Sequence, residues 1–169
     1  AISEAKKEDF DWESIFSGAE WFHFTGITPA LSENVLEICK EACQVAKKKG
    51  VKISCDVNYR SKLWTKEAAR EAMTALSEYI DMIIINEEDA KIVFGIEADK
   101  TDVNTGKLNK EGYEEVARKL MERFRFSEVA ITLRESKSAS DNDWSGLLYD
   151  GKECLFSKVY PVHIVDRIG

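Results

Sequence analysis

Short runs of β-branched and aromatic residues alternate along this chain with longer stretches whose apolar positions recur at helical spacing. Repetition of this strand-helix unit is typical of an α/β fold, in which right-handed crossovers build a parallel sheet. Helices are then expected on both faces of that sheet. The runs that predict strands are Glu20–Thr25, Val51–Asp56, Met82–Ile85 and Val129–Leu133.

Residues that start and stop helices separate these runs. Ser32, Thr65 and Asn86 each stand directly before an amphipathic stretch and are predicted N-caps, because a short polar side chain there can accept an exposed backbone N–H. Gly50 and Gly95 follow two of the stretches and are predicted to end them. Helices are therefore expected over about residues 33–49, 66–79, 87–94 and 110–123, with a short one at 10–16.

The last part of the sequence has a different pattern. Asp150-Gly151 lies between the strand-like runs Trp144–Tyr149 and Cys154–Val159. Asp-Gly in that position favours a β-hairpin. Val162–Val165 predicts one more strand, and the polar stretch Asp99–Asn109 predicts a surface loop.

Length, charge and cysteine content limit the function classes. We expect residues 1–169 to form a single α/β domain, truncated at both ends. A net charge of −7 argues against nucleic-acid binding, because no basic excess exists to neutralise phosphates. No apolar run approaches the roughly 20 residues that span a bilayer, so no membrane partner is expected. The four cysteines complete no metal-binding spacing, which favours reduced thiols in a cytoplasmic protein.

Candidate chemistry follows the ends of the predicted strands, where ligands bind in open parallel sheets. Asp56, Asn58 and Arg60 occupy every second position, so in an extended chain they project to one face. Together they suit a polyhydroxylated anionic ligand, whose acid group Arg60 can clamp with two parallel hydrogen bonds. The alternative is that Asp56 and Arg60 pair with each other or with loop backbone.

Two further clusters follow the third and fourth strands. Asn86 and Asp89 begin a helix, where capping and the helix dipole alone explain them. Carboxylates beside a phosphate site can also hold Mg²⁺ through water. Thr132, Arg134 and Ser136 alternate along an extended stretch and can approach a nucleotide phosphate. A solvated strand end is the alternative for these three.

The C-terminal residues offer one more candidate. Asp166 follows the last apolar strand and leads to Gly169, which suits an anion-binding turn, although a single glycine does not make such a loop. The sequence contains no Walker A motif, no Gly-x-Ser-x-Gly elbow and no dinucleotide fingerprint. His23 lies within an aromatic run and is interpreted as a packed strand residue.

Taken in order, these segments resemble the ribokinase (PfkB) family of carbohydrate kinases over nearly the whole chain. The most specific part is Asp56-Val-Asn-Tyr-Arg-Ser-Lys-Leu-Trp64, which is similar to a run in 2-keto-3-deoxygluconate kinases. Asn86-Glu-Glu-Asp89 resembles the family's Asn-x-x-Glu motif, with Asp in the last place. Thr132–Lys137 lies where the family has its nucleotide loop, without the two glycines. Asp166–Gly169 resembles the start of the Asp-x-x-Gly-x-Gly-Asp signature.

The resemblance implies a ribokinase-like fold with a hairpin near the C-terminus. It further implies ATP- and Mg²⁺-dependent phosphorylation of 2-keto-3-deoxygluconate to its 6-phosphate, and a homo-oligomer for the full-length protein. Asp56, Asn58 and Arg60 would bind the sugar acid, and Asp89 would hold Mg²⁺ through water. The implied ATP contacts are Asn86, Thr132, Arg134, Ser136, Asp166 and Gly169.

The signature's final Asp, which is the general base for the accepting hydroxyl, would lie beyond Gly169. We therefore expect the chain as given to be inactive and to fold poorly alone. Two other functions stay open: a kinase for another sugar such as fructose or ribose, and a non-catalytic sugar- or nucleotide-binding module. A Gly-x-Gly-Asp continuation would favour a kinase over the module.

Overall fold

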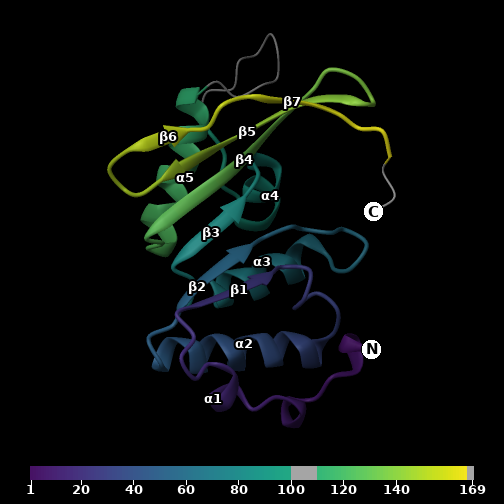
Figure 1. Cartoon of the computed structure of the whole chain (residues 1–169), viewed down its shortest axis with the longest axis vertical. Coiled ribbons are helices and arrows are strands. Elements are labelled where there is room, and N and C mark those ends of the chain that lie inside the picture. The colour runs from purple at the N-terminus through teal and green to yellow at the C-terminus, as the bar shows by residue number, and fades with distance from the viewer. Residues whose placement is uncertain (100–109, 167–169) are drawn as a thin grey trace.

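The computed structural model describes residues 1–99 and 110–166, so the predicted loop Asp99–Asn109 falls almost entirely outside the described residues, and so does Gly169. One sheet runs through the described chain in the order β1-β2-β3-β4-β5-β6, with β7 paired to β5 (Figure 1). Its strands are β1 (Trp21–Thr25), β2 (Lys52–Asp56), β3 (Met82–Ile85), β4 (Glu128–Ser136), β5 (Asp141–Tyr149), β6 (Cys154–Phe156) and β7 (Tyr160–His163).

Strands β1 to β4 are parallel, whereas β5, β6 and β7 pair antiparallel with their neighbours. The parallel strands are joined by helical crossovers: α2 (Glu33–Lys48), α3 (Lys66–Leu76), and α4 (Glu87–Asp89) followed by α5 (Lys110–Phe124). The predicted α/β class and the hairpin near the C-terminus are confirmed. Helices were also expected on both faces of the sheet, but α2, α3 and α5 pack on one face, because right-handed crossovers between strands that follow in chain order all fall on the same side.

The predicted N-caps and the two glycine stops are also confirmed, whereas the helix expected to residue 79 ends at Leu76. The side-chain oxygens of Ser32, Thr65 and Asn86 accept the backbone N–H three residues further on, at 3.3, 3.2 and 2.7 Å. Gly50 and Gly95 have φ angles of +73° and +67°, which glycine adopts without strain. Local sequence therefore fixes where the crossover helices begin and end.

The helix predicted after Asn86 is not regular. Helix α4 lasts three residues and passes into a single π-helical segment, η3 (Ala90–Phe94). Arg70 of α3 donates to carbonyls near the end of η3, and Arg123 Nη1 of α5 donates to Phe94 O at 2.6 Å. These guanidinium groups satisfy carbonyls that a helix end leaves without partners. The N-terminal segment carries η1 (Ile2–Glu4), η2 (Lys7–Asp9) and α1 (Trp12–Ile15).

One face of the sheet forms the core. Alternate residues of the strands point into this core, and Ile53, Ile83, Ile85 and Val129 are each at most 1% exposed. They belong to one cluster with the buried sides of α2, α3 and α5. Helices α3 and α5 lie behind the sheet in Figure 1. Burial of large side chains here is the main stabilising contribution.

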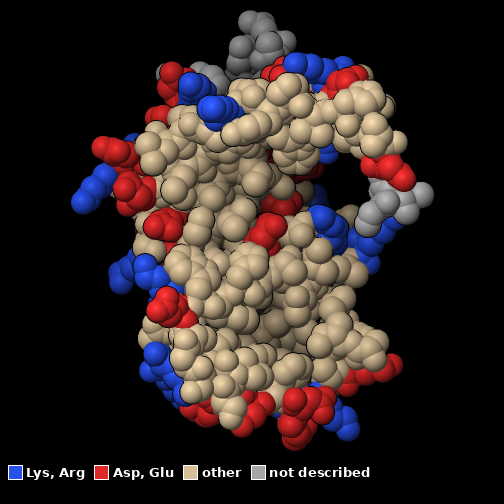
Figure 2. All heavy atoms as spheres, viewed as in Figure 1, with Lys and Arg blue, Asp and Glu red and all other residues tan. Residues whose placement is uncertain are grey.

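The opposite face of the sheet is partly exposed although it is largely apolar. Trp21 is 47% exposed, and Met82, Ile84, Ala130 and Leu148 are half-buried. Figure 2 shows this side as a broad surface with few charges. Within the described residues, no helix is long and apolar enough to cross a membrane.

Strands β4, β5 and β7 form an antiparallel arm. β4 continues past the end of β3, and its pairing with β5 extends from Val129–Tyr149 to Ser136–Asn142. β7 pairs with the first part of β5 and is exposed at all four of its positions. The strand predicted at Val162–Val165 thus begins two residues earlier, at Tyr160, because its limits are set by its partner and not by its own apolar run.

Candidate functional site

The polar residues predicted after β1, β2 and β3 gather at one edge of the sheet. Thr25 is level with Asp56, and Asp56 is level with Ile84, so the three strands end side by side. Asn58 Nδ2 donates to Thr25 Oγ1 at 3.3 Å, and Asn86 comes directly after β3. We call this group of strand ends the carboxyl edge.

Gly26 allows the first two strand ends to approach closely. Its backbone N–H donates to Asp56 O at 2.7 Å. A Cβ atom at this position would lie 2.1 Å from Val57 O, which no side chain can tolerate without a backbone shift. Glycine is therefore required here by the packing of β1 against the loop that follows β2.

The loop after β2, residues 57–64, presents Arg60 to solvent at the carboxyl edge. The loop turns at Asn58, whose φ of +43° is uncommon for a residue other than glycine. Arg60 Nη1 donates to Tyr59 O at 2.9 Å, and within the described residues the guanidinium forms no ion pair. Arg60 thus keeps donors for an external carboxylate.

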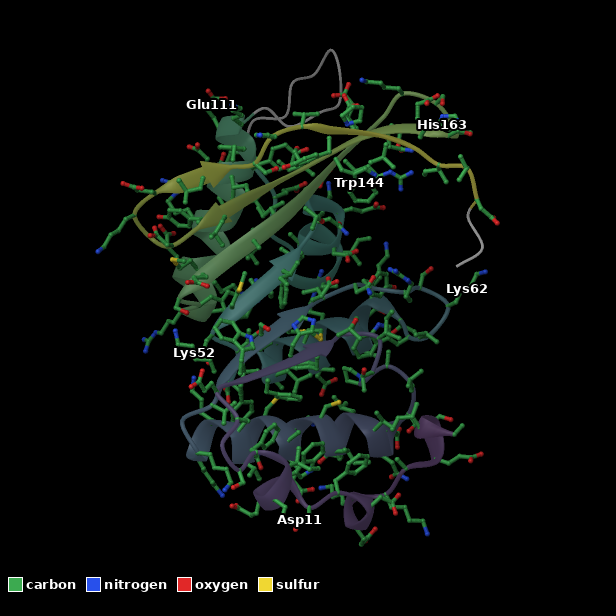
Figure 3. The ribbon with its side chains drawn as sticks, viewed as in Figure 1. Asp11, Lys52, Lys62, Glu111, Trp144 and His163 are labelled. Carbon is green, nitrogen blue, oxygen red and sulfur yellow. The ribbon has the colours of Figure 1, made fainter. Side chains whose placement is uncertain are left out.

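The surroundings of Arg60 are open. Lys62 lies at the outer end of the same loop (Figure 3), and it adds a second positive charge on this side. Figure 2 shows the surface hollowed here, between the lower part of the molecule and the arm. The edge can therefore be reached by a soluble anionic ligand.

Asp89 lies directly beneath this loop. It is 7% exposed, and its Oδ2 accepts the backbone N–H of Tyr59 at 3.0 Å. Asn86 Oδ1 in turn accepts the backbone N–H of Asp89. The Asn86–Asp89 turn, interpreted from sequence as a cap with a metal contact, therefore also supports the loop that carries Arg60.

Three carboxyl groups at the carboxyl edge are buried or partly buried, which makes their ionised forms less favourable. Burial raises the pKa of Asp56, Glu87 and Asp89 above the ordinary values. The charges of His23 and Arg60 oppose the rise in the pKa of Asp56, and the Tyr59 N–H and Arg60 oppose it for Asp89. Such a concentration of desolvated carboxyls is typical of functional sites.

A metal ion held only by protein side chains does not fit this edge. Across residues 1–99 and 110–166, no three His, Cys, Asp or Glu side chains gather as direct ligands. Glu87 and Asp89 are oxygen donors at a partly desolvated position, which suits a hard cation whose other ligands are phosphate oxygens and water. The residues present fit a water-mediated Mg²⁺ contact, and the role predicted for Asp89 stays a prediction.

The predicted nucleotide residues of β4 lie on the arm. Arg134 Nε and Ser136 Oγ both donate to Asn142 Oδ1, at 2.9 and 2.8 Å. The Arg134 guanidinium also lies over the Trp144 ring, 5.4 Å from its centroid. Figure 3 shows Trp144 on the arm, above the strand ends. Arg134 and Ser136 are thus brought together, although by strand pairing and not in a glycine loop.

The other predicted nucleotide residues are spread along the same side. Thr132 is exposed on β4, one residue past the part of the strand that pairs with β3, and Asn86 follows β3 itself. Asp166 is exposed beyond β7, and Gly169 falls outside the described residues. The structure joins Asn86 and Thr132 to the carboxyl edge, because Asn86 follows β3 and Ile131 is level with Ile85.

Two polar features were missed from the sequence. Ser54 is 3% exposed, and its Oγ accepts from Trp21 Nε1 at 2.7 Å and lies 2.8 Å from His23 Nδ1. His23, interpreted as a packed strand residue, is instead exposed on the open face. Asn142 is 1% exposed and organises the arm. The His23-to-Ser54 pairing needs the β1–β2 register, and Asn142 stands in a polar stretch typical of a loop.

Comparison with known proteins identifies the family. The whole chain, residues 1–169, matches the pfkB family of carbohydrate kinases. The chain belongs to this family. It superposes on the crystal structure of 2-dehydro-3-deoxygluconokinase from Thermotoga maritima with a TM-score of 0.91 and 48% identity, over 100% of this chain and 49% of that one.

One further relative and one solved structure of lower identity are similar to the chain. The 2-dehydro-3-deoxygalactonokinase of Haloferax volcanii is 29% identical over 169 residues, which is 100% of this chain and 46% of that protein. A crystal structure from E. coli, described as a ribokinase II in complex with ATP and Mg²⁺, shares the fold at 18% identity and a TM-score of 0.66, over 98% of this chain and 47% of that one. This pfkB-family chain therefore spans about half the length of the relatives it matches.

Proposed function

We propose that the full-length protein transfers a phosphoryl group from ATP to a 2-keto-3-deoxy sugar acid, forming the 6-phosphate of 2-keto-3-deoxygluconate. Family membership supports a carbohydrate kinase. The names of the Thermotoga and Haloferax relatives support a 2-keto-3-deoxy acid as substrate class. The single observation that supports an acidic substrate is Arg60 at the carboxyl edge, whose guanidinium forms no ion pair among the described residues.

The carboxyl edge would act mainly by positioning. Arg60 would clamp the substrate carboxylate with parallel hydrogen bonds, which fixes one end of the sugar. Asp56 and Asn58 would line the region where the accepting hydroxyl meets the phosphoryl group. Holding the reactants in this way converts a bimolecular step into an effectively unimolecular one. No residue of this chain is proposed as the base.

The nucleotide would lie across the β3–β4 side of the edge. We assign Asn86, Thr132, Arg134, Ser136, Asp166 and Gly169 to ATP. Asp89 would hold Mg²⁺ through water, and the ion, when bound, neutralises charge on the phosphates. Residues 1–169 would thus supply binding groups, and we expect them not to turn over substrate alone.

A substrate panel with the full-length protein tests this proposal. We expect faster turnover on 2-keto-3-deoxygluconate or 2-keto-3-deoxygalactonate than on fructose or ribose. Arg60→Ala should raise KM for the acids at least about tenfold, because a charge-assisted pair is lost. It should leave KM for ATP nearly unchanged. Lys62→Ala, on the same loop, is the control for simple loss of charge. Higher kcat/KM on fructose or ribose would overturn the substrate class.

A further inference from the structure

We propose that Asp89 is a positioning residue for acid recognition: its buried carboxylate holds the Tyr59 backbone N–H and so fixes the loop that presents Arg60. This inference rests on the proposed function, and it assigns Asp89 a role that a magnesium contact would not supply. Three features of the described residues carry it: the conformation of the loop, the burial of Asp89 and the bonding of the Tyr59 peptide.

The loop needs outside support to keep its conformation. Asn58 has a φ of +43°, and a residue other than glycine adopts this region only at an energetic cost. The loop also leaves β2 where the ladder hydrogen bonds end: Val57 N still donates to Ile84 O at 2.9 Å, whereas Tyr59 N does not reach a strand. Within the loop, Leu63 N donates to Arg60 O at 3.0 Å, and further support at Asn58 and Tyr59 comes from side chains of other elements.

Two side chains from neighbouring strand ends supply that support. From the β1 side, Thr25 Oγ1 accepts from Asn58 Nδ2 at 3.3 Å. From the β3 side, Asp89 Oδ2 accepts from Tyr59 N at 3.0 Å. The second bond has a carboxylate acceptor in a buried position, so it is the stronger of the two.

The bond to Asp89 acts on the peptide group next to Arg60. The Tyr59 carbonyl accepts from Arg60 Nη1 at 2.9 Å, and Tyr59 Oη donates to Trp64 O at 3.4 Å. Tyr59 thus contacts Asp89 through its N–H, Arg60 through its carbonyl and the loop end through its hydroxyl. A change at Asp89 is transmitted to the guanidinium through a single residue.

Burial of Asp89 argues that this bond is retained for a purpose. The side chain is nearly inaccessible, and no described Lys or Arg forms an ion pair with it within 4 Å. A buried carboxylate without an ion pair costs stability unless hydrogen bonds compensate. Asp89 Oδ2 accepts from the Tyr59 N–H, and this compensating bond points to placement of the loop.

Three variants of the full-length protein separate positioning from metal binding. Asp89→Ala removes the acceptor and should raise KM for the sugar acid about tenfold at saturating Mg²⁺, a change that loss of a water-mediated metal contact alone would not produce. Asp89→Asn keeps one oxygen acceptor and should restore most of the wild-type KM. Glu88→Gln, the exposed neighbour on the same turn, should leave KM unchanged.

A double variant and an exchange measurement complete the test. Arg60→Ala with Asp89→Ala should have the same acid KM as Arg60→Ala alone, because the two residues act through one group. Hydrogen exchange at the Tyr59 amide should be faster in Asp89→Ala and unchanged in Arg60→Ala, whether or not the proteins turn over substrate.

The outcomes distinguish the inference from the proposed function. If Arg60→Ala leaves the acid KM unchanged, the proposed acid contact fails, and the exchange data alone decide the role of Asp89. If Arg60→Ala raises KM but Asp89→Ala raises the Mg²⁺ requirement instead, positioning is overturned in favour of a metal contact. Unchanged Tyr59 exchange in both Asp89 variants also overturns positioning. If Asp89→Ala does not fold, Asp89→Leu, which fills the same space but accepts no hydrogen bond, replaces it in the exchange comparison.

Discussion

The parallel half of the sheet, β1 to β4 with its crossover helices, contrasts with the antiparallel arm of β4, β5 and β7. In the parallel half, large side chains such as Ile53 and Ile83 are wholly buried, and the strand ends are level with one another. In the arm, β7 is exposed along its length. Asn142 of β5 is a buried polar residue of the arm.

The contrast separates two ways of placing functional groups. In the parallel half, backbone register brings Asp56, Asn58 and Asn86 to a common edge, because all strands end on the same side. In the arm, Arg134 and Ser136 are placed by a shared side-chain acceptor, Asn142. The proposed sugar-acid groups and Asn86 thus rest on a packed scaffold, whereas the proposed nucleotide groups Arg134 and Ser136 rest on a hydrogen-bonded one.

The largest expected effect of a single substitution in this comparison is at Gly26. In Gly26→Ala the new Cβ would meet Val57 O at 2.1 Å, so β1 must move away from the Arg60 loop. We expect a loss of about 3 kcal/mol in the free energy of unfolding. Chemical denaturation of the full-length protein measures it. Gly146→Ala in the arm, where the Cβ would lie 3.5 Å from Ile131 O, should change stability by less than about 0.5 kcal/mol.

Equal effects of the two alanines would show that the Gly26 contact is relieved by a small backbone shift. In that case the close approach of β1 to the loop would not be a requirement of the fold.

A smaller effect is expected at Asn142. Asn142→Ala removes the acceptor shared by Arg134 and Ser136 and should cost about 1–2 kcal/mol of stability. It should also raise KM for ATP while leaving KM for the sugar acid unchanged, because the carboxyl edge does not depend on the arm. Thermal melting and steady-state kinetics measure the two effects, with exposed Lys158→Ala as control. A rise in the acid KM instead would contradict the separation of the two regions.

The smallest effect concerns the pH dependence of stability at the carboxyl edge. Burial raises the pKa of Asp56 above its ordinary value of 3.8, so folding favours the protonated form. The stability from this group is complete below pH 3.8 and is lost as pH rises through the higher folded-state pKa. Asp56→Asn removes this loss, and we expect its melting temperature at pH 7 to be about 2 °C above wild type.

Turnover of Asp56→Asn should fall, since the carboxylate lies at the proposed site. Melting curves between pH 4 and 7 test the sign, with Glu20→Gln as the control. The melting temperature of the wild type should approach that of Asp56→Asn as pH decreases. A melting difference that does not change with pH would show that the carboxylate is not penalised by burial.

The sequence predicted the parallel half well because its signals are local. Met82–Ile85 is wholly apolar and forms β3 with those bounds, and Ser32 and Thr65 cap the helices that follow them. The arm was predicted less well. β5 begins at Asp141, in a polar stretch, because its partner β4 continues past the end of β3. Such pairing depends on a partner strand, so neither strand's own sequence indicates it clearly.

The candidate site shows the same limit. The alternation of Asp56, Asn58 and Arg60 predicted that a polar group follows β2. The contact between Asp89 and Tyr59 was not predictable, since it joins a side chain to a backbone group 30 residues away. A backbone donor has no sequence signature, so only the three-dimensional arrangement reveals it.

The hydrogen bond that Asp89 accepts from a main-chain N–H affects how substrate specificity can change by mutation or evolution. Every amino acid except proline supplies a backbone N–H, so position 59 tolerates almost any side chain without losing this anchor. The neighbouring positions can then vary with the sugar while the loop keeps its attachment. A library that randomises residues 59 and 61–63 and excludes proline at 59 would therefore sample new specificities while Asn58, Arg60 and Asp89 are kept.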